Sequence, residues 1–144
     1  MMADDEAGIF ERMRMAVALG VKIAMGSDCG GNEARLHGVN ADELPLYVRC
    51  GMTPMQAILA GTIEAAKAIR RDTQVDSVEA GKLADFVVIE GDPLTDIGLV
   101  VSGVVAVVQS GRVVRDNHGL LDDLHRATPP RRTTTTAIQP RFLV

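Results

Sequence analysis

Residues 21–31 read V-K-I-A-M-G-S-D-C-G-G, and this stretch decides how the rest of the chain is interpreted. The apolar run 21–25 predicts a short buried strand, and Gly26, Ser27 and Asp28 follow it directly. An acidic side chain just past the end of a buried parallel strand is positioned for catalysis or for holding a metal. The alternative is an aspartate that caps the next turn, as is common in loops. Residues 21–31 alone favour that alternative.

The segment before this strand has the pattern of an amphipathic helix over residues 3–19. Ile9, Met13, Ala16 and Val17 recur at helical spacing, and Gly20 is a natural stop. A helix followed at once by a strand is an α/β unit, whose strand would pair in parallel with its neighbours. The sequence contains only one such unit, so the neighbouring strands must come from elsewhere.

Composition excludes several classes of function. A net charge of −4, a pI of about 5.3 and few aromatic residues argue against nucleic-acid binding. No apolar run reaches the roughly 20 residues that span a bilayer, so no membrane segment is expected. The acidic start at residues 1–6 does not resemble a secretory or transit signal. Cys29 and Cys50 form no paired motif, so we expect reduced thiols and a cytoplasmic protein.

Two further helices are predicted in the middle of the chain. The first runs to about Cys50. Either Asn40 caps it, with Glu43 closing a capping box, or Asp42 does, which suits Pro45 better. The second begins at residues 53–56, T-P-M-Q, a capping box with proline at the first helical position. It is expected to run to about Arg70 as a core helix.

The pattern changes to that of strands after residue 75. Residues 77–82 and 84–89 look like strands, 100–101 and 103–108 form a further apolar stretch, and 109–114 indicate a hairpin. The region thus predicts a small antiparallel sheet. Residues 117–127 suggest a short helix on which His118, Asp122 and His125 have a metal-like spacing, although a solvated face explains them better. Low complexity predicts disorder over 128–144.

Three motifs in order carry a resemblance to a known family. They are G-V-K-I-A-M-G-S-D at 20–28, G-M-T-P-M-Q-A-I at 51–58 and V-E-A-G-K-L-A-D-F-V-V-I-E-G-D-P-L-T-D-I at 78–97. Together with His37-Gly38 and N-A-D-E-L at 40–44, they resemble the C-terminal portion of the amidohydrolase superfamily, in its imidazolonepropionase-related and prolidase-like subgroup. The likeness covers about residues 5–115. It departs at Asp76, where the family commonly has a glycine; this affects a turn.

The resemblance implies an α/β fold that is a C-terminal fragment of a (β/α)8 TIM-like barrel, followed by part of a small β-sandwich. Residues 1–72 would be the last barrel units, with 21–25 as the eighth strand, 73–116 the sandwich strands, and 117–144 a helix and tail. The implied activity is metal-dependent hydrolysis of amides, cyclic amides or dipeptides. Asp28 would be the catalytic aspartate and a metal ligand, zinc by preference, and His37 would lie near the substrate.

The remaining metal ligands of the family have no counterpart in this sequence. Only His37, His118 and His125 are present, and there is no His-x-His motif, whereas a catalytic zinc needs about three protein ligands. We therefore expect the isolated chain to bind no catalytic metal and to be inactive. It would be part of a hydrolase that needs an N-terminal barrel half. The alternatives are a non-catalytic remnant, acting as a homo-oligomer or interaction module, and a complete small α+β binding domain.

Overall fold

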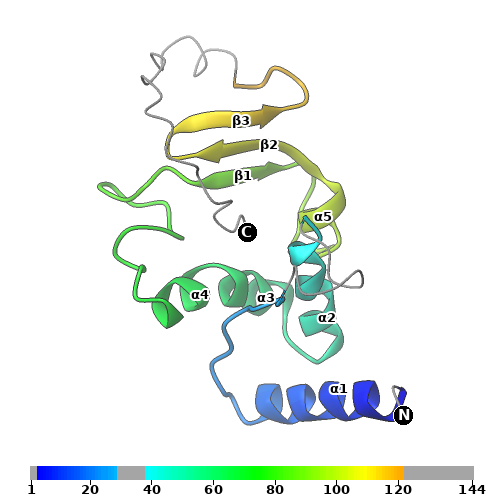
Figure 1. The fold of residues 1–144 in the computed structure, drawn as a ribbon. Helices are drawn as coiled ribbons and strands as arrows, with labels where there is room; N and C mark the ends of the chain where they lie inside the picture. Colours follow the sequence, from blue (N-terminus) through cyan, green and yellow to red (C-terminus); the bar gives the residue numbers. More distant parts are fainter. Residues whose placement is uncertain (1–2, 29–37, 122–144) are drawn as a thin grey trace.

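A computed structural model describes residues 3–28 and 38–121 of the chain. The described residues form helices below a small sheet (Figure 1). In chain order the elements are α1 (Ala3–Ala18), η1 (Asn40–Asp42), α2 (Glu43–Arg49), α3 (Pro54–Gly61), α4 (Ile63–Ala68), β1 (Phe86–Ile89), α5 (Leu99–Ser102), β2 (Val104–Gln109) and β3 (Arg112–Asp116). No helix within these residues is long and apolar enough to cross a bilayer.

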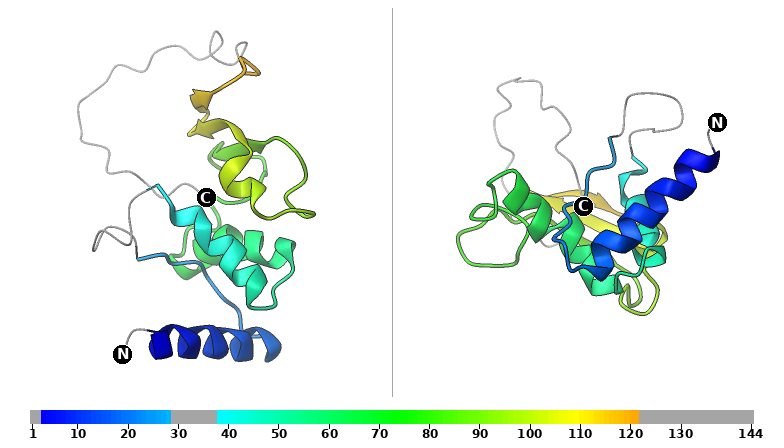
Figure 2. Two further views of the ribbon diagram at one scale, coloured as in Figure 1. Left: turned by 90° about the vertical axis from the view of Figure 1, so that its right-hand side faces the viewer. Right: turned by 90° about the horizontal axis from the view of Figure 1, so that it is seen from below.

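Helix α1 lies on the side of the helical layer that faces away from the sheet, as both side views show (Figures 1 and 2). Its predicted extent is confirmed, but its apolar face is only partly covered. Met13 packs against the core, whereas Ile9 is 55% exposed. The guanidinium of Arg49 lies over the ring of Phe10, 5.4 Å from its centroid, and links α1 to α2.

The predicted strand at residues 21–25 is not formed within the described residues. A strand is defined by backbone bonds to a neighbouring strand, and the sheet lies beyond the helical layer (Figure 1). Met25 donates its N–H instead to the carbonyl oxygen of Ala60 in α3, at 2.9 Å. Val21 is 55% exposed rather than buried. The segment is therefore an irregular connection anchored at its far end.

The helix before Cys50 starts later than a cap at Asn40 would give. Residues Asn40–Asp42 form a 3-10 turn, and α2 begins at Glu43 without a side-chain cap bond. Pro45 then falls in the first turn, where its missing N–H costs no helical hydrogen bond. The side chain of Asn40 is used elsewhere, in bonds to Gly38 and Ser27.

The predicted capping box at Thr53 is confirmed. The hydroxyl of Thr53 accepts from the N–H of Gln56, and the side chain of Gln56 accepts from the N–H of Thr53. The long core helix is instead two helices, α3 and α4, joined at Thr62. Its hydroxyl donates to the carbonyl oxygen of Ile58 at 2.8 Å, a local bond that disturbs the helical ladder.

A small hydrophobic core holds the helices together. Its buried members are Leu44, Tyr47, Ala57 and Ala60. The small side chains on α3 let α2 approach closely, because an alanine face leaves room for the larger leucine and tyrosine. Residues from three other parts of the chain pack against this cluster, namely Met13, Ile23, Met25, Ile97 and Val100. The core therefore fixes the end of segment 21–28 relative to α2 and α3.

The sheet is antiparallel with strand order β1-β2-β3. Central strand β2 buries four successive residues, 105–108, and the β2–β3 hairpin is confirmed. Ser110 and Gly111 both have positive φ, 52° and 73°, as a tight type I′ turn requires.

Two strand predictions are wrong. Residues 77–82 form a turn in which Lys82 donates its N–H to the carbonyl oxygen of Glu79, at 3.2 Å. The pair 100–101 lies in helix α5. The β-branched side chains of Val100 and Val101 favour a strand. Asp96 instead begins a turn just before them, because its side chain accepts a hydrogen bond from the N–H of Gly98 at 2.9 Å.

Asp76 has a backbone φ of 65°, in the left-handed region that favours glycine. This explains why a glycine would suit the position. It agrees with the expectation that having aspartate here, where the family commonly has glycine, affects a turn. Burial raises the pKa of Asp76 above its ordinary value, and the charge of Asp85 adds to this, while Lys82 opposes it. The folded state therefore disfavours the charged carboxylate.

Asp76→Asn should stabilise the chain at pH 7 by about 0.5 kcal/mol, because asparagine tolerates the left-handed backbone and carries no charge. A carboxyl with a raised folded pKa contributes stability that is present below its unfolded pKa and lost as pH rises. The gain from asparagine should thus disappear below about pH 3.8, where both side chains are neutral. Urea unfolding at pH 7 and pH 3 measures it, with exposed Asp42→Asn as control. A loss of stability at pH 7 would contradict this prediction.

Candidate functional site

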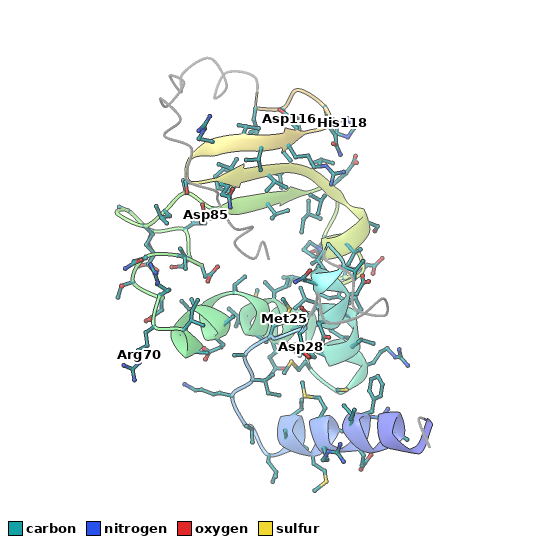
Figure 3. All side chains as sticks on the ribbon, viewed as in Figure 1. Met25, Asp28, Arg70, Asp85, Asp116 and His118 are labelled. Atoms are coloured by element: carbon teal, nitrogen blue, oxygen red, sulfur yellow. The ribbon has the colours of Figure 1, made fainter. Side chains whose placement is uncertain are left out.

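Residues 26–28 belong to no regular element and are called the turn below; they include the predicted catalytic aspartate and lie beside α2 and α3 (Figure 3). Two of the three residues before Asp28 are hydrogen-bonded to the helical layer. Met25 donates its N–H to Ala60 of α3, and the Oγ of Ser27 accepts from the side chain of Asn40 in η1. The turn is therefore fixed by the helical layer, although no strand precedes it in the described residues.

Tyr47 of α2 reaches the turn from the core. Its side chain is 9% exposed and packs with Leu44, Ala57 and Ala60. Burial raises the pKa of the Tyr47 hydroxyl above its ordinary value of 10.0, and the negative charge of Glu43 adds to this. A backbone hydrogen bond from Gly26 acts in the opposite direction. Tyr47 is thus a core residue whose hydroxyl lies near enough to Gly26 for its pKa to be affected by it.

Tyr47 should titrate at higher pH in the folded chain than in the urea-unfolded chain. It is the only tyrosine and the chain has no tryptophan, so absorbance at about 295 nm reports this one group. Because the unfolded state ionises first, this stability contribution is complete below pH 10 and is lost as pH rises through the folded pKa. Tyr47→Phe should remove that part of the pH dependence. A folded pKa equal to or below the unfolded one would refute the prediction.

Asn40 follows segment 29–37 in the chain, and its side chain binds Ser27, which precedes that segment. Its Nδ2 donates to the Oγ of Ser27 at 3.2 Å, and its Oδ1 accepts from the N–H of Gly38, also at 3.2 Å. One amide group therefore joins the residue before Asp28 to the residue after the segment. An amide suits this role because it carries donors and an acceptor on one planar group.

Asp28 itself is exposed and has a backbone φ of 50°. Aspartate is one of the few residues that tolerates this left-handed conformation. Arg70, Asp76 and Ser110 share it in turns, so the conformation by itself does not mark a functional residue. An exposed carboxylate on a fixed turn can accept a proton or bind a cation. Whether Asp28 also caps a turn depends on the following residues, which lie outside the described ones.

His37, the predicted substrate-binding residue, lies outside the described residues, as do Cys29, Asp122 and His125. The predicted helix at 117–127 is not formed up to residue 121. There the carboxylate of Asp116 accepts from the N–H groups of His118, Leu120 and Leu121, which lowers the pKa of Asp116. His118 lies at the far end of β3, well away from Asp28 (Figure 3). The structure therefore does not bring these two residues together.

A metal does not fit the described residues by themselves. Within residues 3–28 and 38–121, no three His, Cys, Asp or Glu side chains are grouped so that they could hold an ion. Asp28 supplies one carboxylate, whereas a catalytic zinc needs about three protein ligands. Any metal site that uses Asp28 must therefore take ligands from other residues.

Sequence reasoning did not single out Tyr47 and gave Asn40 a different role. Asn40 has the spacing of a helix cap relative to Glu43, and this local pattern hid its bond to Ser27, 13 positions earlier. Tyr47 falls on the apolar face of a short helix, where a core residue is the ordinary interpretation. No sequence pattern indicates that its hydroxyl lies near Gly26.

Comparison with known proteins matches most of the chain to one family. The profile of the amidohydrolase family matches residues 9–114. The imidazolonepropionase of Symbiobacterium thermophilum is 34% identical over 109 residues, which cover 74% of this chain and 26% of that protein. The imidazolonepropionase of Syntrophobacter fumaroxidans is 29% identical over 112 residues, covering 76% and 26%. The chain thus spans about a quarter of the length of these curated relatives.

Solved structures show the same likeness. A Xaa-Pro dipeptidase with bound methionine in its active site is 38% identical, with a TM-score of 0.67, covering 74% of this chain and 25% of that one. Molinate hydrolase is 30% identical, also with a TM-score of 0.67, covering 90% and 30%.

Proposed function

The chain belongs to the amidohydrolase family, and on this premise we propose that it forms the C-terminal part of a catalytic domain that hydrolyses carbon–nitrogen bonds. The observation that supports this most directly is the anchored turn that presents Asp28 as an exposed carboxylate. Residues 1–72 would complete a (β/α)8 barrel, and 73–116 would contribute to a small β-sandwich. The tail 117–144 has no assigned part in the chemistry.

Asp28 acts as the general base in this proposal. Its carboxylate takes a proton from the attacking water as the water oxygen bonds to the carbonyl carbon. When the carbon–nitrogen bond breaks, the same proton passes to the leaving amine, so the carboxylate is restored. The turn contributes by holding the carboxylate at a fixed place, because general bases act only within hydrogen-bond reach of the proton. His37 would contact the substrate.

The family is generally metal-dependent, and we propose that a divalent ion, zinc by preference, belongs to the complete site. Because the described residues hold only one suitable carboxylate there, the other ligands must come from residues other than the described ones, and in this proposal mainly from an N-terminal barrel half. The substrate class is a small amide, cyclic amide or dipeptide, as the names of the relatives suggest. We place the protein in the cytoplasm, without nucleic-acid or membrane partners.

An oligomerising interaction module is the second candidate function. It is favoured by large apolar side chains that remain exposed around α1 and α4, among them Leu19 at 77% and Ile69 at 69%. Such side chains cover one another when two surfaces associate. In the hydrolase proposal, the rest of the barrel covers them instead.

Two chimeras, called grafts below, test the hydrolase proposal. In each, this whole chain replaces the matching quarter of a relative, the Symbiobacterium imidazolonepropionase or the Xaa-Pro dipeptidase. At least one graft should hydrolyse its parent's substrate, and the active parent indicates the substrate class. If both grafts fold cooperatively and neither hydrolyses its substrate, the proposal fails. A stable oligomer of the chain alone would then favour the interaction module.

A further inference from the structure

We propose that Val100 of α5 is a positioning residue for Asp28, and that it acts through Asn40 of η1. The link has three steps in space. Helix α5 lies against η1 and the helical core, Asn40 in η1 bonds Ser27, and Asp28 follows Ser27 in the chain. The sheet region thereby supports the geometry of a site in the helical layer. The role of Asp28 rests on the proposed function, but the contacts themselves do not.

The first step attaches α5 to the end of β1. The N–H of Glu90 donates to the carbonyl oxygen of Gly103 at 2.8 Å, and the N–H of Gly103 donates to that of Leu99, also at 2.8 Å. A Cβ atom at Gly103 would lie 2.9 Å from the carbonyl oxygen of Leu99 and 3.0 Å from that of Glu90, so glycine permits this close approach. Because both bonds meet at Gly103, a movement of β1 carries α5 with it.

The second step attaches α5 to the helical layer. Val100, with Ile97 just ahead of the helix, packs against the buried core to which Leu44 belongs. Leu44 is the second residue after η1, and α5 also lies directly against η1. Val101, the next residue of α5, is instead 46% exposed. Packed side chains transmit a displacement to their neighbours, so the place of η1 depends on Val100.

The third step is the side chain of Asn40, which is half-buried in η1. Its Nδ2 donates to the Oγ of Ser27, and its Oδ1 accepts from the N–H of Gly38, both at 3.2 Å. A planar amide makes both bonds only in one orientation, so a displaced η1 cannot keep them both. A shift of about 1 Å can reduce a catalytic rate by roughly a hundredfold. Since a general base acts in the chemical step, the effect should appear in kcat rather than in KM.

Kinetics of an active graft test the positioning role. Val100→Ala should lower kcat by about 3- to 10-fold and Asn40→Ala by about 10- to 100-fold, with KM changed by less than about threefold in each. The matched control is Val101→Ala, the same substitution on the exposed side of α5, which should leave kcat unchanged. In an Asn40→Ala background, Val100→Ala should lower kcat by less than about twofold more, since it acts through Asn40. A loss no larger than that of Val101→Ala, or an undiminished loss in the double variant, would overturn the role.

Amide hydrogen exchange in the chain alone tests the link without any activity. Asn40→Ala removes the acceptor of the Gly38 N–H, whose exchange should accelerate by at least about threefold. Val100→Ala should accelerate the same N–H by at least about twofold, and Val101→Ala should not. The N–H of Met25, bonded to Ala60, should stay protected in all three variants, because the core remains folded. If Val100→Ala also exposes Met25, the milder Ile97→Val takes its place.

Unchanged exchange at Gly38 in Asn40→Ala, or in the variant of the α5 region, would overturn the link. Accelerated exchange at Gly38 together with two folded but inactive grafts would overturn the proposed function and leave the link standing.

Discussion

Asp28→Asn should lower hydrolysis by an active graft by about 10²- to 10⁴-fold, the usual contribution of a general base. Asparagine keeps the size and the tolerance of the left-handed backbone that Asp28 adopts, so the turn should persist. What is lost is the negative charge and the ability to take a proton. The loss should therefore appear in kcat, and circular dichroism should show a folded protein.

Asp42→Asn is the matched control for this experiment. Asp42 is an exposed carboxylate in η1 that makes no side-chain cap bond to α2, and its neutralisation should change kcat by less than about twofold. If the two variants had equal activity, Asp28 would not be the base. A loss in both would indicate that net charge, rather than a particular carboxylate, supports the reaction.

Leu44→Ala should cost about 2–5 kcal/mol in the free energy of unfolding of the chain. Leu44 is 2% exposed and belongs to the core that joins α2 to α3, so its removal leaves a cavity that the neighbouring alanine side chains cannot fill. Urea unfolding followed by circular dichroism measures the change. Because Tyr47 shares this core, its fluorescence should report the same transition.

Leu120→Ala is the control for the core variant, since Leu120 is 59% exposed. Its backbone N–H bond to Asp116 does not involve the side chain, and the expected cost is below about 0.5 kcal/mol. Equal costs for the two leucines would mean that the helical core is not the main source of stability. The packing of α2 on α3 would then need revision.

Local signals predicted the helical part of the fold well. The capping box at Thr53 depends on residues three positions apart, so the sequence contains all of it. The sequence allows α2 to start after Asn40 or after Asp42; the structure has the later start, and the side chain of Asn40 is bonded to Ser27, which is not local. The strand at 21–25 is not formed within the described residues, because a strand needs neighbouring strands, and the sequence indicates that these come from elsewhere.

The candidate site, like the fold, could be predicted from the sequence only in part. Asp28 could be named because it lies in a motif that resembles a family, but the side chains that hold its turn could not. Tyr47 is the 21st residue after Gly26 in sequence, and the two come near one another only in the folded chain. In the sheet, the hairpin was predicted from Ser110 and Gly111, whereas α5 was mistaken for a strand because its valines are β-branched.

Elemental analysis of bound metal tests most directly whether Asp28 belongs to a site that this chain shares with further polypeptide. The purified, tag-free chain should hold less than about 0.1 equivalent of zinc, manganese or iron, because one carboxylate is far from the three ligands that such a site needs. An active graft should hold about one equivalent or more, and its Asp28→Asn variant clearly less. About one equivalent in the chain alone, or equal metal in the graft and its Asp28→Asn variant, would contradict the shared site.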